Sequence, residues 1–337
     1  MKILLYTGME KTIKMSGLGK AIQHQKKALE ENHVDYTTNP KEIKDCDIVH
    51  INFFDPKSYL LAKKAKRLEK KVIYHAHSTK EDFKNSFIFS NQLAPLFKWW
   101  ICKCYKLGDY IISPTPYSKK IQEGYGLHPI EAISNGIDMN LFKKDKTAGK
   151  KFRKTYGYQQ NDKIVIGIGL YLKRKGILDF VEMAKRCPEY KFIWFGYLDL
   201  KLVPKEIRKA VNTKLPNLTF AGYVNQEMIH AALSGGDVYF FPTLEETEGI
   251  PLIEAFSSKI DTVIRDIPIF EWVEDGKEVY KGKTVDDFEE LIRKLMNKEL
   301  PSLADPAYEL AKTCEIKTVG KKLIEVYNKV LDTNDKN

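Results

Sequence analysis

The sequence lacks long hydrophobic runs and has few cysteines. No stretch of 18 or more consecutive apolar residues occurs in the 337 residues, which argues against a membrane-spanning helix. The five cysteines form no Cys-x-x-Cys pair, so neither a disulfide framework nor a zinc site is expected. The start, MKILLYTGMEK, has only a short apolar segment and predicts no signal peptide. We therefore expect a cytoplasmic protein with reduced thiols and no metal site.

The excess positive charge is confined to the first half of the chain. Residues 1–150 contain 26 Lys and Arg against 16 Asp and Glu, whereas residues 151–337 contain 29 of each. This asymmetry predicts an anionic partner surface, either nucleic acid or an acidic membrane leaflet, although a merely solubilising basic surface would look the same. Nucleic acid is disfavoured, because the most basic predicted helix, 58–71, has Tyr59 as its only aromatic residue.

Apolar runs alternate with helical segments in both halves of the chain. The predicted strands are 1–7, 47–53, 71–75, 109–113 and 130–133, followed by 163–169, 191–196, 218–221, 238–242 and 261–264. The clearest predicted helices are 17–31, 58–70, 176–186, 227–234 and 251–258. Strands joined by helices of this length indicate parallel sheets, so we predict an α/β fold with two doubly wound, Rossmann-like domains.

The predicted domains span 1–147 and 148–315, and a C-terminal helix in 316–337 is expected to pack back toward the first domain. The Lys-rich residues 143–163 show no apolar period, which places the linker near their start. Since parallel sheets bind ligands at the carboxyl ends of their strands, we expect a ligand cleft between the two domains.

Two carboxylates flank a predicted loop-to-helix junction in the second half. In EETEGIPLIE, Glu246 precedes Gly249 and Pro251, and Glu254 falls one turn into the helix. Free N–H groups at a helix N-terminus favour a phosphate, whereas carboxylates beside it suit hydroxyl donors such as those of a sugar or ribose. A solvated helix start is the alternative reading of such a pair.

This segment and several others resemble one family. Residues 222–254, Ser-Gly-Leu-Gly at 16–19, His77 after a strand, Asn-Gly-Ile-Asp at 135–138 and Lys175-Gly176 are similar to the motifs of retaining family 4 glycosyltransferases of the GT-B fold. The resemblance implies a UDP-sugar donor, glucose or galactose, with no metal and no further cofactor. By this resemblance Glu246 contacts the transferred sugar and Glu254 the ribose. The remaining loop residues Thr247, Gly249 and Ile250 are expected at the nucleotide-sugar.

Basic and glycine-rich turns supply the expected phosphate contacts. Arg174 and Lys175 follow a predicted strand and could neutralise a diphosphate leaving group, although an ordinary basic turn would look alike. The family usually has Arg directly after Gly169, where this chain has Leu170, so we expect Arg174 to replace that contact. Gly17 opens the first helix, where a glycine allows the backbone to approach a ligand closely.

His77 lies just beyond the strand KVIYH. The resemblance assigns it a place near the donor sugar and the reacting centre, which makes Glu246, His77 and Lys175 the predicted catalytic residues. His75 is expected to be either a companion on the same strand face or a structural histidine.

The acceptor is inferred from the first half. On a helical wheel the apolar side chains of 93–107 form one arc, which includes Leu96, Trp100 and Ile101 and suits either a membrane interface or the protein core. The segments HAHST, SGLGKAIQHQ and EETEGI resemble bacterial glycosyl-diacylglycerol synthases, which implies a peripheral enzyme on the inner face of the cell membrane. We expect monoglucosyl-diacylglycerol as the acceptor; diacylglycerol itself and a soluble polysaccharide acceptor remain the alternatives.

Overall fold

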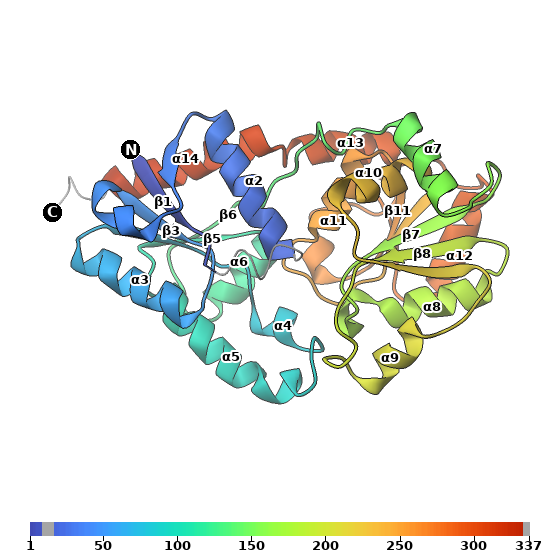
Figure 1. Ribbon diagram of the computed structural model, residues 1–337, viewed down its shortest axis with the longest axis horizontal. Coiled ribbons are helices and arrows are strands. Elements are labelled where there is room, and N and C mark those ends of the chain that lie inside the picture. The colour runs from blue at the N-terminus through green and yellow to red at the C-terminus, as the bar shows by residue number, and fades with distance from the viewer. Residues whose placement is uncertain (9–16, 333–337) are drawn as a thin grey trace. The chain divides into compact units, whose positions relative to one another are not determined.

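The computed structural model describes residues 1–8 and 17–332, which form two compact units (Figure 1). The first unit comprises Met1–Phe83, Asn91–Ile137 and Cys314–Asn337, and the second comprises Lys84–Ser90 and Asp138–Thr313. The C-terminal segment thus folds with the first unit, and a short segment from the first half of the sequence folds with the second. Each unit is described by itself.

The first unit contains a parallel sheet of six strands in the order β2-β1-β3-β4-β5-β6. Its strands are β1 (Lys2–Tyr6), β2 (Asp35–Thr37), β3 (Ile48–Ile51), β4 (Lys71–His75), β5 (Tyr110–Ser113) and β6 (Ile130–Ala132). Its helices are α2 (Gly17–Glu31), η1 (Pro40–Asp45), α3 (Pro56–Arg67), α4 (Lys80–Phe83), α5 (Ser90–Tyr105), α6 (Pro116–Glu123) and α14 (Ile316–Asp332). In Figure 1 the red helix α14 lies alongside the blue helix α2, and Asn32 Nδ2 donates to the carbonyl of Lys317.

Side chains of these strands alternate between two apolar layers. Ile48, Ile73 and Ile112 face a core that includes Leu323 and Val326 of α14. Their neighbours along the strands face a second core, which includes Ile101 and Cys104 of α5. Both faces of the sheet are therefore covered, as a parallel sheet with helical crossovers requires.

The second unit repeats the architecture with the order β12-β11-β10-β7-β8-β9, again all parallel. Its strands are β7 (Ile164–Ile168), β8 (Lys191–Phe195), β9 (Leu218–Gly222), β10 (Val238–Phe241), β11 (Asp261–Arg265) and β12 (Tyr280–Gly282). Its helices are α7 (Lys146–Thr155), η2 (Lys173–Lys175), α8 (Ile177–Arg186), α9 (Lys205–Val211), α10 (Gln226–Gly235), α11 (Ile250–Ser257), η3 (Pro268–Phe270), α12 (Val285–Met296) and α13 (Ala304–Lys312).

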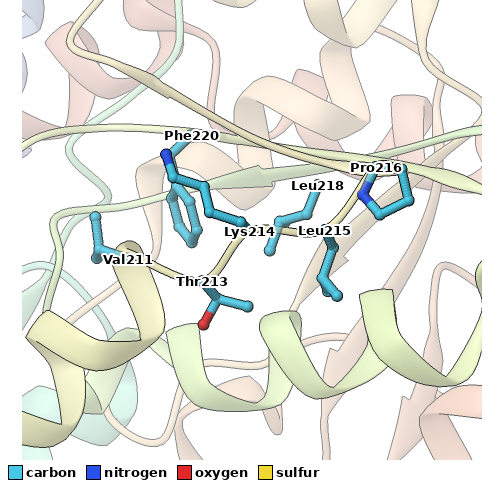
Figure 2. Close-up of a pocket in the computed structure, with 7 residues that line it drawn as sticks. All are labelled: Val211, Thr213, Lys214, Leu215, Pro216, Leu218 and Phe220. Carbon is cyan, nitrogen blue, oxygen red and sulfur yellow. The ribbon is translucent and has the colours of Figure 1, made fainter.

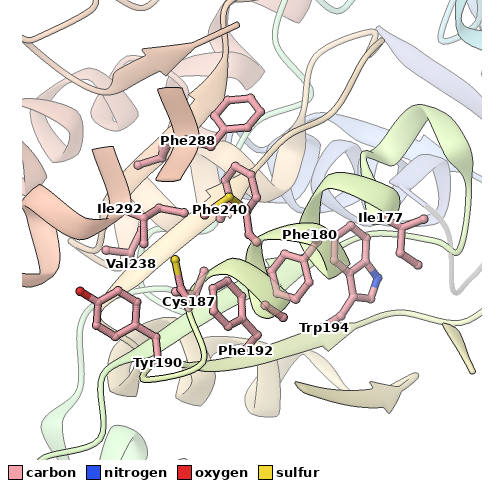
Figure 3. Packing of buried hydrophobic residues seen from close by; sticks show 14 of the residues in the cluster. Ile177, Phe180, Cys187, Tyr190, Phe192, Trp194, Val238, Phe240, Phe288 and Ile292 are labelled. Atoms are coloured by element: carbon pink, nitrogen blue, oxygen red, sulfur yellow. The ribbon is translucent and has the colours of Figure 1, made fainter. Parts of the chain in front are cut away.

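An aromatic core fills one face of this second sheet (Figure 3). Phe180 of α8 meets Trp194 of β8 edge to face, with the ring centroids 5.0 Å apart, and Phe240 of β10 meets Phe288 of α12 at 4.9 Å. Such pairs add to the burial of apolar area. The two parallel sheets confirm the predicted class, a doubly wound α/β fold in each unit.

Two expectations about the elements need correction. Residues 143–163, for which no helix was predicted, contain α7, and its Phe152 is fully buried. The apolar arc of 93–107 is divided between the protein core and the surface. Ile101 and Cys104 are core residues, whereas Leu93 and Leu96 are half or more exposed. None of the helices in the described ranges is long and apolar enough to cross a lipid bilayer.

Candidate active site

The loop between β10 and α11 is shaped by glycine and proline. Gly249 precedes α11 with φ at 88° and ψ at 54°, a left-handed conformation that a side chain disfavours. Pro251 stands in the first turn of the helix, where its missing N–H has no intrahelical partner to lose. The sequence therefore folds here as predicted, with a loop that turns into a helix start.

The basic turn η2 packs against the start of this loop. Gly176, which ends η2, has φ at 74°, and a Cβ there would lie 2.2 Å from the carbonyl oxygen of Pro242. Only glycine allows so close an approach. The carbonyl of Arg174 accepts hydrogen bonds from the Leu244 amide at 2.6 Å and from Thr243 Oγ1 at 2.9 Å. The two segments, which are about 70 residues apart, are thus held together through backbone groups.

The charges of these two segments meet at Glu246. The Lys175 ammonium donates to Glu246 Oε1, and Arg174 Nη1 lies 3.9 Å from Oε2. Thr243 Oγ1 is 3.3 Å from Oε1. The side chains of Arg174 and Lys175 are each 13% exposed and that of Glu246 is 7% exposed, so this is a nearly buried ionic cluster. Removing Glu246 would take the carboxylate from two nearly buried cations, whereas removing Lys175 would leave Glu246 with the longer ion-pair contact to Arg174.

Arg174 is also held from a distant segment of the sequence. Its Nε donates to Ser86 Oγ at 3.0 Å, and its Nη1 lies 3.3 Å from the carbonyl oxygen of Glu245. Ser86 belongs to Lys84–Ser90, the segment that folds with the second unit. Sequence reasoning missed Ser86, since no local pattern indicates a partner 88 positions away.

Glu254 lies in α11 and is fully buried. Glu254 and Glu246 both act electrostatically on Tyr239 of β10, and burial together with these carboxylates raises the pKa of the Tyr239 hydroxyl well above its usual range. Ile250 is also buried, whereas Thr247 is partly exposed. The loop 243–250 therefore combines buried carboxylates with a helix N-terminus, which suits a ligand with both hydroxyl and phosphate groups.

The remaining predicted residues lie in the first unit. His77, beyond the end of β4, is 8% exposed, and its Nε2 lies 2.9 Å from Oδ1 of Asn52. Gly17 is the first residue of α2, and a Cβ there would meet no atom of the described residues within 4 Å. Packing within the described parts does not demand this glycine. Ser16 of the same motif lies outside the described residues.

A pocket of about 300 Å³ lies elsewhere in the second unit, beside the edge strand β9 (Figure 2). Its lining residues are Val211, Thr213, Lys214, Leu215, Pro216, Leu218 and Phe220. None of the predicted site residues lines it. The chemistry suggested by the sequence is therefore not located in this pocket.

The structure brings Arg174, Lys175 and Glu246 into direct contact, and it places Gly249 and Ile250 on the loop that follows Glu246. His77 and Gly17 belong to the other unit. Asn52 was missed, although a polar residue directly after a buried parallel strand is a recognisable signal. The roles assigned to these side chains stay predictions.

Two known families match the chain, one mainly over the second unit and one mainly over the first. The family described as Glycosyl transferases group 1 matches residues 149–313, and the family described as Glycosyltransferase Family 4 matches residues 29–141. The chain is 38% identical over 336 residues to a processive diacylglycerol alpha-glucosyltransferase of Acholeplasma laidlawii, with 98% of this chain and 99% of that protein covered. It is 24% identical to an alpha-galactosylglucosyldiacylglycerol synthase of Streptococcus pneumoniae, over 69% of this chain and 63% of that one.

Solved structures agree on the fold. Anabaena HepE, solved in complex with UDP-glucose, superposes with a TM-score of 0.75 at 17% identity, covering 98% of this chain and 100% of that one. Sucrose-phosphate synthase from Thermosynechococcus elongatus superposes with a TM-score of 0.71 at 15% identity, covering 86% of this chain and 75% of that one. These likenesses establish the GT-B fold.

Proposed function

Since the chain belongs to the glycosyltransferase family that these group 1 and family 4 matches define, we propose that it transfers glucose from UDP-glucose to diacylglycerol lipids. One observation carries the proposal, namely the 38% identity to the Acholeplasma laidlawii diacylglycerol alpha-glucosyltransferase over almost the full length of both chains. That protein is named as processive. We therefore include monoglucosyl-diacylglycerol, the product of a first transfer, as an acceptor for a second.

The ionic cluster of the second unit is proposed as the donor site. Glu246 would accept hydrogen bonds from hydroxyls of the transferred sugar, and Glu254 would do the same for the ribose. Arg174 and Lys175 would stabilise the charge that develops on the diphosphate as the bond to the sugar breaks. The cluster supports this assignment because both cations and the carboxylate lie at one loop-to-helix junction.

The proposed reaction retains the anomeric configuration. The acceptor oxygen attacks the anomeric carbon on the face from which UDP departs, and the electron pair of the broken bond goes to the β-phosphate oxygen. That oxygen takes the proton of the acceptor hydroxyl. The protein contributes by positioning and by charge stabilisation, without a covalent intermediate.

A lipid acceptor requires contact with a membrane surface, and α5 offers a suitable face. Leu93, Leu96 and Trp99 follow one another at a spacing of three residues and are 50%, 60% and 56% exposed. Lys103 Nζ lies 5.0 Å from the centroid of the Trp99 ring. An exposed apolar row with cations beside it is typical of helices that lie in a lipid interface. We propose that this row binds the anionic inner leaflet of the cell membrane.

The function is tested with UDP-glucose and UDP-galactose in mixed micelles that contain either diacylglycerol or monoglucosyl-diacylglycerol. We expect glucosylated lipid from both acceptors, with an α-linkage by NMR, and Glu246→Gln as the inactive control. Transfer only to monoglucosyl-diacylglycerol would restrict the enzyme to the second step. Transfer only to soluble glycans would refute the lipid proposal.

Metal independence follows from the same proposal, because Arg174 and Lys175 would neutralise the leaving diphosphate. We expect addition of EDTA to leave the initial rate within about twofold, measured at saturating UDP-glucose. A loss of rate that Mg²⁺ or Mn²⁺ restores would contradict this prediction and would assign charge stabilisation to a metal ion.

A further inference from the structure

The side chain of Arg265 joins several segments of the second unit. Arg265 ends β11, and its Nε donates to the carbonyl oxygen of Pro242 at 3.1 Å. Its Nη1 donates to the carbonyl oxygen of Lys283 at 2.8 Å, and its Nη2 donates to Asp179 Oδ2. The guanidinium lies over the ring of Phe288, a residue of the aromatic core in Figure 3, with 4.9 Å between its central carbon and the ring centroid. Since the side chain is only 12% exposed, the guanidinium is fixed beneath the surface by bonds in three directions.

Two of these partners border the segments that form the ionic cluster. Pro242 directly precedes the loop 243–250, which carries Glu246. Asp179 lies in the first turn of α8, the helix that follows the basic turn η2. Arg265 therefore connects the segment that carries the carboxylate of the cluster to the segment that carries its two cations.

The carbonyl of Pro242 is also a point of direct contact between these two segments. A Cβ at Gly176 would lie 2.2 Å from its oxygen, so the two backbones touch there. The next residue, Thr243, has its Oγ1 2.9 Å from the carbonyl oxygen of Arg174 and 3.3 Å from Glu246 Oε1. A shift of the Pro242 carbonyl would therefore pass to both sides of the cluster through one residue.

We propose that Arg265 is a positioning residue, which sets the spacing between η2 and the loop 243–250 and so places the cations that bind the donor diphosphate. This inference rests on the proposed function, which assigns the diphosphate to Arg174 and Lys175. Within residues 1–8 and 17–332, Arg265 makes no hydrogen bond or ion pair with the ionic cluster, so it acts on the diphosphate through its carbonyl and carboxylate partners. Cations that are fixed before the ligand arrives cost less free energy to order on binding.

An arginine suits this place because of its shape and its charge. The planar guanidinium presents donors in fixed directions, which lets one side chain hold two carbonyl oxygens and a carboxylate. Burial lowers the pKa of Arg265 and raises the pKa of Asp179, so both groups are largely withdrawn from water. Removing one member of such a pair is costly, because the other is left without its counter-charge.

Arg153 offers a matched control in the same unit. Its Nε donates to the carbonyl oxygen of Gly235 at 2.8 Å, and its Nη2 donates to Asp237 Oδ2 at 3.0 Å. Its Nη1 donates to the carbonyl oxygens of Gln159 and Asp162. The side chain is 18% exposed, so it resembles the first arginine in burial and in the kind of partner. However, Gly235 and Asp237 precede β10, whereas the ionic cluster lies beyond the carboxyl ends of the strands.

Binding of UDP alone, measured by isothermal titration calorimetry, tests the inference without an acceptor. Arg265→Met should raise the Kd of UDP by about 10-fold, because the ligand must then order the cations itself. It should also lower kcat for UDP-glucose by about 10- to 100-fold, the cost of misplaced groups at a reacting centre. Arg153→Met should lower the thermal midpoint comparably but keep both the Kd and kcat within about threefold, because a distant site acts independently of the cluster.

A double-mutant cycle shows whether Arg265 acts through the cluster. In the Lys175→Met background, Arg265→Met should raise the Kd of UDP by only about threefold or less, because one of the cations that it places is gone. Arg153→Met should change the Kd by the same small factor in both backgrounds. An equal factor for Arg265→Met in both backgrounds would overturn the inference, since its effect would then be independent of Lys175.

The inference is also overturned if folded Arg265→Met binds UDP as tightly as Arg153→Met does. If Arg265→Met does not fold, Asp179→Asn decides, because it removes the carboxylate and leaves the bond to Pro242. We expect its Kd for UDP to rise by about three- to tenfold, and a Kd equal to that of the wild-type protein overturns the inference. Absence of UDP binding by the wild-type protein would refute the proposed donor and this inference with it. UDP binding without transfer to lipid would refute only the proposed acceptor, and the Kd values would still decide the role of Arg265.

Discussion

At the scale of single residues, Lys175 combines a structural role with a proposed catalytic role, so a substitution of Lys175 changes both stability and activity. It balances the buried carboxylate of Glu246, and it is the proposed cation for the leaving diphosphate. A loss of activity on its removal could therefore come from lost stability or from lost chemistry. The two effects can be separated by also removing the charge of Glu246, because this second substitution corrects the loss of stability but does not restore the lost chemistry.

We predict that Lys175→Met lowers the free energy of unfolding of the second unit by about 3 kcal/mol, because Glu246 loses its closest cation and keeps the longer ion-pair contact with Arg174 and the hydrogen bond from Thr243 Oγ1. The same variant should lose about 2–4 kcal/mol of transition-state stabilisation, measured as a drop in kcat/KM. The double variant Lys175→Met with Glu246→Gln should recover most of the stability in urea titrations but none of the activity. Recovery of both would show that the cluster is structural.

A second prediction at the residue scale concerns stability in acid and the histidine stack, the stacked rings of His50, His75 and His77. Burial lowers the pKa of His50 and of His77 to about 3 and that of His75 well below its usual range. In the unfolded chain these groups titrate near about 6.5, so the unfolded state binds more protons between the two values. The stability is therefore complete above about pH 6.5 and falls as the pH decreases toward 3, by up to about 1.4 kcal/mol per pH unit for each histidine.

Urea midpoints at pH 7, 6 and 5 check this expectation. We expect His50→Phe to reduce the slope of stability against pH, and the surface variant His128→Gln, which leaves the stack intact, to serve as the control. A slope that is the same in His50→Phe and in the wild-type protein would show that other groups cause the acid sensitivity.

At the scale of elements, α5 divides its apolar residues between two environments. Ile101 and Cys104 are fully buried in the first unit, and Trp100 Nε1 donates to the carbonyl of Phe54 at 2.6 Å. The neighbouring Trp99 is 56% exposed. Of the two alternatives that the sequence left open for Trp100 and Ile101, these contacts favour the protein core, and the exposed row is the one that includes Trp99.

We predict different outcomes for the two tryptophans. Trp99→Ala should leave the thermal midpoint nearly unchanged and weaken binding to phosphatidylglycerol vesicles at every salt concentration, because apolar insertion is not screened. Trp100→Ala should instead destabilise the first unit by about 3–5 kcal/mol. Cosedimentation with vesicles and calorimetry distinguish the two results. Vesicle binding that is unaffected by Trp99→Ala would remove this face as the membrane contact.

At the scale of the whole molecule, the C-terminal helix contributes to the unit that contains the N-terminus. Its buried residues Leu323, Val326 and Tyr327 pack with Ile3 and Leu5 of β1. The first unit therefore needs residues from both ends of the chain to cover one face of its sheet. Stability of that unit should depend on the last helix, although most of the second unit lies between them in the sequence.

We predict that Leu323→Ala lowers the stability of the first unit by about 2–5 kcal/mol, the usual range for a buried leucine that leaves a cavity. Lys322→Ala, an exposed neighbour in α14, should change it by less than about 0.5 kcal/mol. Limited proteolysis with mass spectrometry would locate the loss. Cleavage that begins within 138–313 in Leu323→Ala would contradict the assignment of α14 to the first unit.

The sequence by itself determined much of the local architecture. Apolar runs between helical segments predicted two parallel sheets, and the glycine and proline of EETEGIPLIE predicted the loop that turns into α11. These features are readable because strand, helix and turn preferences depend on spacing within a few residues. The same sequence motifs carried the resemblance to family 4 glycosyltransferases, which the comparisons confirmed.

Only the tertiary structure decided which distant residues meet. It paired Lys175 with Glu246, joined Arg174 to Ser86, set Asn52 against His77 and selected the buried face of α5. An amphipathic pattern indicates that a helix has an apolar face, but it does not say whether protein or lipid covers each part of that face. Contacts between residues tens to hundreds of positions apart depend on how whole layers pack, so a local pattern can mark a polar residue at a strand end but does not say which distant residue it meets.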